Sequence, residues 1–191
     1  MNQVTGLILA GGMARRMGGG DKGLRKFRGK AMVEHAIERL SPQVDTLFIN
    51  ANQNRESYAA LGYAVIADVI DGYAGPLAGL HAGLSACTTP LLVTAPCDSP
   101  FLPLDLVARL RTALEADAAQ LAVARAGGWS QPVFALCRRE VLDSLSAFLA
   151  TGGRKVDAWF AALNVVAVPF PDEAAFTNIN TPEELERLEN Q

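Results

Sequence analysis

VTGLILAGG, at residues 4–12, is a short apolar run that ends in two glycines. The apolar part, residues 4–10, predicts a buried β-strand, and the glycines predict the turn that ends it. The segment that follows, residues 11–30, is rich in glycine and in basic residues. Loops of this length are uncommon in compact domains and are usually functional. We therefore expect a strand, a tight turn and a functional loop, in that order.

Strands and helices are expected to alternate along the rest of the chain. Apolar runs predict strands at residues 46–50, 63–67, 90–95, 120–124, 132–136 and 165–168. Spacing and helix-starting residues predict helices at 31–40, 56–61, 77–86, 103–116, 140–149 and 155–163, and a last helix that Thr181 caps and Pro182 begins. Continuous apolar strands separated by helices are typical of a parallel sheet covered on both faces. We predict that residues 1–191 form one α/β domain, a Rossmann-like three-layer fold with a mainly parallel, doubly wound sheet.

Polar residues stand where several of these strands end. Such sheets bind ligands at the carboxyl ends of their strands, and Asn50, Asp68 and Asp98 are found at those positions. We expect them to share one edge with the glycine turn. Each also has a simpler interpretation, because asparagine and aspartate close turns or cap helices, and Asp68 could pair with a basic surface residue.

Composition restricts the function classes. Half of the 191 residues are apolar and the net charge is −3, which is ordinary for a globular protein and argues against a general nucleic-acid binder. The cations are concentrated, however, in the segment after the first strand, where Asp21 alone opposes them: Arg15, Arg16, Lys22, Arg25, Lys26, Arg28 and Lys30. This excess indicates a site for a small polyanion, and the alternative is a solvated basic loop.

Cysteine and histidine usage gives no metal or disulfide pattern. The three cysteines lie far apart without a CxxC pair, so we expect reduced thiols, and Cys97 as a small buried residue. The two histidines lack zinc-ligand spacing. No apolar run approaches the roughly 18 residues that span a bilayer. We therefore expect a cytoplasmic protein that binds neither membrane nor nucleic acid.

The glycine-rich loop suits phosphate. Gly11 and Gly12 allow the backbone to turn sharply and approach a ligand, and free N–H groups there can cradle phosphate oxygens. Arg15, Arg16 and Lys22 would supply charge. The alternative is a plain turn before a surface loop.

Two familiar phosphate motifs fail in this loop. Gly18, Gly20 and Gly23 match GxGxxG without directly following the strand, and Gly29-Lys30 is not followed by serine or threonine. Dinucleotide-fingerprint and Walker A enzymes are therefore disfavoured.

Several segments together resemble a known enzyme family. Leu9-Ala10-Gly11-Gly12, Arg16-Met17-Gly18 and Asp21-Lys22 are similar to the signature of nucleotidyltransferases that act on sugar phosphates, isoprenoid phosphates and pterin cofactors. Within that superfamily the chain resembles the molybdenum cofactor guanylyltransferases. The resemblance spans almost the whole chain and continues, in family order, through residues 21–24, 50–52, 75–79, 96–98 and 178–182.

The resemblance implies a reaction and a set of site residues. A molybdopterin-type acceptor would attack the α-phosphate of GTP and release pyrophosphate, which needs charge neutralisation and alignment more than a covalent catalyst. Asp98 would hold Mg²⁺, and Arg16, Lys22 and Asp98 would be the catalytic residues. The implied nucleotide-binding residues are Leu9, Ala10, Gly11, Gly12, Lys22, Asn50, Asp68 and Asp98. The implied acceptor-binding residues are Gly75, Pro76, Leu77, Gly79, Arg154, Lys155, Asn178 and Asn180.

Alternatives stay open at this point. Cytidylyltransferases of the same cofactor tend to carry Ala-Ala-Gly where this chain has Ala10-Gly11-Gly12, which favours GTP here. A cytidylyltransferase, or an enzyme with another phosphorylated acceptor, would share the mechanism. A non-catalytic GTP-binding or carrier module would bind nucleotide without releasing pyrophosphate. Transient contact with molybdoenzyme chaperones or cofactor-synthesis proteins is compatible with catalysis.

Overall fold

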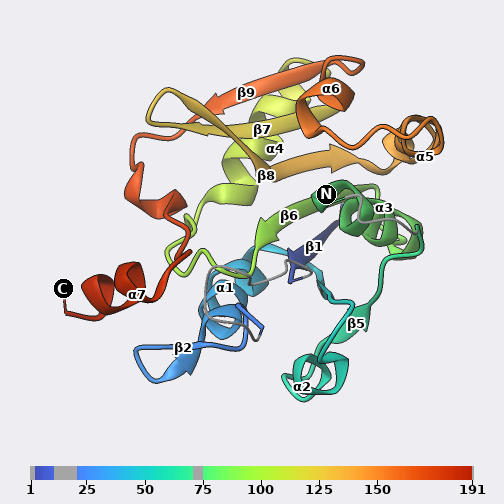
Figure 1. The fold of residues 1–191 in the computed structure, drawn as a ribbon. Helices are drawn as coiled ribbons and strands as arrows, with labels where there is room; N and C mark the ends of the chain where they lie inside the picture. Colours follow the sequence, from blue (N-terminus) through green and yellow to red (C-terminus); the bar gives the residue numbers. More distant parts are fainter. Residues whose placement is uncertain (1–2, 11–20, 71–74, 191) are drawn as a thin grey trace.

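The computed structural model describes residues 3–10, 21–70 and 75–190. Within them, seven strands form one sheet in the order β5-β4-β1-β6-β8-β7-β9 (Figure 1). Their bounds are β1 Val4–Leu9, β4 Thr46–Asn50, β5 Ala64–Ile66, β6 Leu91–Pro96, β7 Leu121–Ala126, β8 Trp129–Arg138 and β9 Val165–Pro169. A separate two-stranded hairpin, β2 Lys26–Phe27 and β3 Lys30–Ala31, lies inside the segment predicted as loop.

The sheet is mainly parallel and doubly wound, as predicted. β1 pairs in parallel with β4 on one side and with β6 on the other. The chain first runs outward through β4 to β5 and then returns to start β6 beside β1. β8 is the exception, because it runs antiparallel to both β6 and β7. As a result, the start of β8 lies at the same edge as the carboxyl ends of β1, β4 and β6.

Helices cover both faces of the sheet. α1 Met32–Leu40 and α4 Leu106–Ala116 pack in one apolar cluster, and α3 Pro76–Ala86, α5 Leu142–Ala150 and α6 Val156–Phe160 pack in the other. Neighbouring side chains of β1 divide between them, with Ile8 in the first cluster and Leu7 in the second. This is the alternation that a strand buried on both faces requires. The predicted three-layer architecture is therefore confirmed.

Two further helices lie at the rim of the sheet. α2 Arg55–Ala59 places Tyr58 in the core beside β5. α7 Pro182–Glu189 packs through Leu185 and Leu188, together with Ile179 from the segment before it, against Phe27 of the β2–β3 hairpin. The predicted start of α7 is confirmed: Glu184 N–H donates to Thr181 Oγ1, while Glu184 Oε2 accepts from Thr181 N–H, each at 3.2 Å. Short 3₁₀ helices lie at Ser41–Gln43, Arg139–Val141 and Ala174–Phe176.

The largest departure from the predicted elements is the β7–β8 hairpin. Gly127 and Gly128 both have positive φ angles, 57° and 82°, and join the two strands in a tight turn. The strand predicted from residue 132 therefore begins at Trp129. The ladder shifts register between Val123 and Ala124, opposite the stretch that contains Pro132, which cannot donate a backbone hydrogen bond. Across the described part of the chain, no helix has the length and apolarity needed to cross a membrane.

Candidate functional site

A pocket of about 370 Å³ opens at the carboxyl ends of the parallel strands. Nine of the residues singled out from the sequence line it: Leu9, Ala10, Lys22, Asn50, Asp68, Gly75, Pro76, Asp98 and Asn178. Asn52, Pro96, Cys97 and Val133 line it as well. The edge predicted from strand polarity is therefore the one that carries the pocket.

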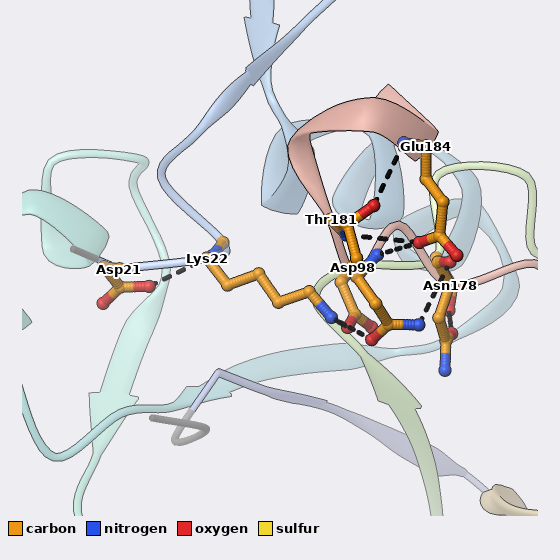
Figure 2. A network of polar contacts seen from close by, with 9 residues as sticks. Asp21, Lys22, Asp98, Asn178, Thr181 and Glu184 are labelled. Atoms are coloured by element: carbon orange, nitrogen blue, oxygen red, sulfur yellow. Dashed lines mark hydrogen bonds and ion pairs between the residues drawn. The ribbon is translucent and has the colours of Figure 1, made fainter. Parts of the chain in front are cut away.

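Lys22 and Asp98 meet inside this pocket. The ammonium of Lys22 donates to Asp98 Oδ2 and, at 2.6 Å, to Asn180 Oδ1 (Figure 2). The two side chains of the ion pair are 17% and 13% exposed, so water screens the contact far less than it screens a surface pair. A cation from the loop after β1, a carboxylate after β6 and an amide before α7 thus converge on one point.

Asp98 keeps one oxygen free for a further partner. Its Oδ1 is buried, and among residues 3–10, 21–70 and 75–190 it has no hydrogen-bond partner. A buried carboxylate oxygen without a donor is costly, and a bound cation is one way to satisfy it. The same described residues contain no cluster of three or more His, Cys, Asp or Glu side chains. Magnesium typically takes only one or two carboxylates and fills its other positions with water and phosphate oxygens. The residues around Asp98 therefore fit Mg²⁺ bound together with a nucleotide.

The segment before α7 holds Asp98 in place. Ile179 N–H donates to the Asp98 carbonyl at 3.0 Å, and Ser99 Oγ donates to Asn178 Oδ1. Glu184 Oε2 accepts from the Asn180 N–H at 2.7 Å. Figure 2 shows this network around the labelled residues Asp98, Asn178, Thr181 and Glu184. The Asn178 amide oxygen and the Asn180 side chain are thus engaged inside the protein, although both asparagines were predicted to bind an acceptor.

A second polar group forms at the ends of β4 and β5. Asn50 Nδ2 donates to Asp68 Oδ1 at 2.9 Å, and Asn52 Nδ2 donates to Asp68 Oδ2 at 2.8 Å. Asn52 Oδ1 in turn accepts from the Asp68 N–H at 2.9 Å. Both oxygens of Asp68 are thereby fixed in orientation, with lone pairs left over for donors on a ligand.

Gly79 lies beneath this group rather than in the pocket. A Cβ built on Gly79 would lie 2.4 Å from Asn50 Oδ1 and 2.6 Å from Leu9 Cδ2. The glycine therefore lets α3 pack closely against the residues that line the pocket. Its predicted contact with an acceptor would have to be indirect.

The first residue of α3 faces the pocket. Gly75, at the N-cap, has φ 59° and ψ −146°, a combination that residues with a Cβ rarely adopt, and Pro76 follows at the first helical position. Helix N-termini carry free N–H groups and a partial positive charge, which suit anionic ligands. Leu77 points elsewhere, into a small apolar cavity that shares Leu9, Pro76 and Val133 with the main pocket.

Arg154 and Lys155 lie outside the main pocket. Both are exposed between α5 and α6, and Arg154 donates to the carbonyls of Leu149 and Gly153 at 3.1 and 2.7 Å. Neither cation lines the small apolar cavity, although the next residue, Val156, does. Gly11, Gly12, Arg15 and Arg16 fall outside the described residues.

The cysteines are structural. Cys87, Cys97 and Cys137 are free and buried. Burial is the main cause that raises the pKa of the Cys97 thiol far above its ordinary value, so it stays protonated beside Asp98. The prediction of a small buried residue at this position is confirmed, and a nucleophilic role is disfavoured because the thiolate is the reactive form.

Known proteins resemble the chain over nearly its full length. The family model described as a MobA-like NTP transferase domain matches residues 6–166. A molybdenum cofactor guanylyltransferase from Cupriavidus taiwanensis is 52% identical over 189 residues, which cover 96% of this chain and 95% of the relative. Its counterpart from Cupriavidus necator is 51% identical, with 100% of this chain and 98% of the relative covered.

The fold is also found in a solved structure of similar description. The crystal structure of molybdopterin-guanine dinucleotide biosynthesis protein A from Archaeoglobus fulgidus superposes with a TM-score of 0.79 at 25% identity, and 97% of each chain is covered.

Proposed function

The chain belongs to the molybdenum cofactor guanylyltransferases, and we propose that it transfers GMP from GTP to the terminal phosphate of molybdenum-molybdopterin in its Lys22–Asp98 pocket. The products are the guanine dinucleotide cofactor and pyrophosphate. The observation that carries the assignment to this pocket is the meeting of Lys22 and Asp98 beside a carboxylate oxygen that no described residue satisfies. That pairing supplies one cation for phosphate and one anion for a metal.

The chemistry is an in-line displacement at phosphorus. An oxygen of the acceptor's terminal phosphate forms a bond to the α-phosphorus of GTP, while the bond from that phosphorus to the bridging oxygen of pyrophosphate breaks. The attacking group is already an anion, so no side chain needs to remove a proton. Mg²⁺, held by Asp98, would supply charge neutralisation and alignment of the phosphates.

Lys22 would neutralise the leaving group. Its ammonium contacts Asp98 and Asn180. Asp98 would hold the cation that accompanies a triphosphate, and Asn180 would keep the Lys22 ammonium oriented toward the phosphates. Negative charge grows on pyrophosphate as the bond breaks, so a preorganised cation stabilises that stage more than the ground state. Arg16 is proposed to add a second cation from the same loop.

The remaining residues are assigned to the nucleotide side or to the acceptor side of the pocket. Asn50 and Asp68 would bind the nucleoside, because the oriented Asp68 carboxylate accepts hydrogen bonds from N–H or O–H groups. The backbone of Leu9, Ala10, Gly11 and Gly12 would line the nucleotide phosphates. Gly75, Pro76 and Leu77 stay proposed for the acceptor side, with Arg154 and Lys155 at its outer rim. Gly79, Asn178 and Asn180 would shape that side through their internal contacts.

We take residues 1–191 as one nucleotidyltransferase domain, since both halves of the chain contribute strands to one sheet. Free, buried cysteines are in keeping with the reducing cytoplasm, where we place the protein. The proposal includes transient contact with molybdoenzyme chaperones or other cofactor-synthesis proteins, to which the product would be passed.

Thermal unfolding with Mg²⁺ and saturating GTP, CTP or ATP tests nucleotide choice. A ligand at 100 times its dissociation constant adds about 2.7 kcal/mol of stability. For a chain of this length that raises the unfolding midpoint by roughly 5–10 °C. A Mg²⁺-dependent rise with GTP alone is expected. A rise with CTP alone would move the chain to the cytidylyltransferase alternative, and GTP binding without pyrophosphate release in the presence of acceptor would favour the carrier module.

A further inference from the structure

The loop that carries Lys22 is fixed by a network on the opposite side from Asp98. Lys22 reaches toward Asp98, whereas Asp21, the preceding residue, points the other way (Figure 2). Asp21 Oδ1 accepts from the Tyr58 hydroxyl at 2.5 Å and from the Gly23 N–H at 3.1 Å. Asp21 Oδ2 accepts from Asn54 Nδ2 at 3.1 Å. The carboxylate thus binds one group of its own loop and two groups of the α2 region.

Tyr58 is the buried member of this network. Its side chain is 0% exposed, and a buried tyrosine hydroxyl normally has a polar partner. Burial is the main cause that raises the pKa of Tyr58 well above its ordinary value, so the hydroxyl keeps its proton and acts as donor to Asp21. The hydroxyl reaches Asp21 past Gly23, where a Cβ would come within 2.5 Å of it. The packing is therefore arranged to let this hydroxyl meet the loop.

From this geometry we infer that Tyr58 is a positioning residue for Lys22, acting through Asp21. A lysine side chain has many rotamers, and its charge helps a reaction only if the backbone that carries it is fixed. Asp21 and Lys22 are adjacent, so a carboxylate clamped by Tyr58 and Asn54 fixes the start of the Lys22 side chain, while Asn180 and Asp98 fix its end. The role of Lys22 in GMP transfer rests on the proposed function, but the positioning itself does not.

Tyr58→Phe is the direct test, because it removes one oxygen and keeps the ring that fills the core. The first readout is acetylation of Lys22 in the nucleotide-free protein, followed by mass spectrometry with Lys30 as internal reference. The Lys22 side chain is 17% exposed and its ammonium donates to both Asp98 and Asn180, so it should react slowly in the wild type. Loss of a hydrogen bond to a charged group changes an equilibrium constant by roughly tenfold. In Tyr58→Phe we therefore expect the acetylation rate of Lys22 to rise, and we take about threefold as the smallest rise that supports the inference. Tyr63→Phe, the same deletion at another tyrosine, should change nothing. An unchanged Lys22 rate in Tyr58→Phe overturns the inference.

The second readout separates positioning from general packing. Tyr58→Phe should lower kcat about tenfold with little change in the KM for GTP, and should cost less than about twofold when Lys22 is already alanine. An equal loss in both backgrounds means that Tyr58 does not act through Lys22 and contradicts the inference. If the wild type itself releases no pyrophosphate, the proposed function fails, while the acetylation rates still decide whether Tyr58 positions Lys22.

Discussion

Lys22 and Asp98 are 76 residues apart in the chain, yet the ammonium of one donates directly to the carboxylate of the other in the pocket. The contact joins the loop after β1 to the end of β6, the two neighbouring strands at which the winding of the sheet reverses. Open α/β sheets bind their ligands at such a reversal. Both residues were singled out from the sequence, and the fold brings them into contact.

Removal of the Lys22 charge should slow turnover sharply. We expect Lys22→Ala to lower kcat by about 100-fold or more, the scale of losing one preorganised electrostatic group. Lys30→Ala is the matched control, because Lys30 is half-exposed, pairs with Glu38 and lies eight residues along the same basic segment. Steady-state pyrophosphate release checks both variants. A loss below about threefold in Lys22→Ala would remove Lys22 from the mechanism.

Asp98→Asn should abolish metal-dependent turnover without unfolding the protein. The amide has nearly the same shape as the carboxylate but lacks the charge that would hold Mg²⁺. We expect activity to stay at background across a Mg²⁺ titration, with the unfolding midpoint within a few degrees of the wild type. Asp105→Asn, at an exposed aspartate at the N-cap of α4, should show the same dependence of activity on Mg²⁺ as the wild type. Near-wild-type turnover in Asp98→Asn would disprove the metal assignment.

Substitutions at two glycines of α3 distinguish an effect on the pocket from an effect on stability alone. Gly79→Ala would push a methyl group against Asn50 and Leu9, whereas Gly83→Ala, one turn later, would push one against Leu7 at 2.5 Å, in the apolar core. Overpacking should destabilise both variants by about 1–3 kcal/mol.

The KM for GTP should rise only in Gly79→Ala, because Asn50 orients Asp68. Urea unfolding and steady-state kinetics on the same preparations measure the two effects. Equal KM values for the two variants would contradict this role of Gly79.

His81 should make the fold sensitive to mild acid. Burial lowers the pKa of its imidazole, and Nε2 lies 2.9 Å from Ser146 Oγ. The unfolded chain binds a proton near the ordinary pKa of about 6.5, whereas the folded chain binds it only at lower pH. The stability that the neutral ring contributes is therefore fully present above the unfolded-state pKa of about 6.5. It is lost as the pH falls from there through the lower pKa of the folded state. Urea midpoints at pH 7.5 and 5.5 should differ more in the wild type than in His81→Gln. An equal shift of the urea midpoint in the wild type and in His81→Gln would refute a role of His81 in this pH dependence.

The sequence was informative about strands and their polar ends because both are local. β4 lies at the predicted residues, β1 and β9 differ from prediction by one residue at one end, and β5 and β6 differ by one residue at each end. The antiparallel direction of β8 was not predicted, since Gly127 and Gly128 were not interpreted as a hairpin turn. That omission also hid Val133, which reaches the pocket only because β8 starts at the carboxyl edge.

Residues that act through other residues were the hardest to find. Tyr58 and Asn54 belong to ordinary helical or turn patterns, and only the fold brings them to Asp21, whereas Glu184 reaches Asn180 within the local start of α7. Asn52 lay inside a segment that carried the family resemblance, but its exchange of hydrogen bonds with Asp68 depends on how β4 and β5 pair. Pairings across 16 to 37 residues leave no periodic signal in a sequence.

The most direct measurement of the proposed function is product analysis. The wild-type protein is incubated with molybdenum-molybdopterin, Mg²⁺ and GTP, CTP or ATP in parallel, and the pterin products are identified by mass spectrometry while pyrophosphate is counted. We predict the guanine dinucleotide with an equal amount of pyrophosphate from GTP, and no dinucleotide from CTP or ATP. A cytosine dinucleotide as the main product, or GTP bound without any pyrophosphate, would contradict guanylyl transfer by this protein.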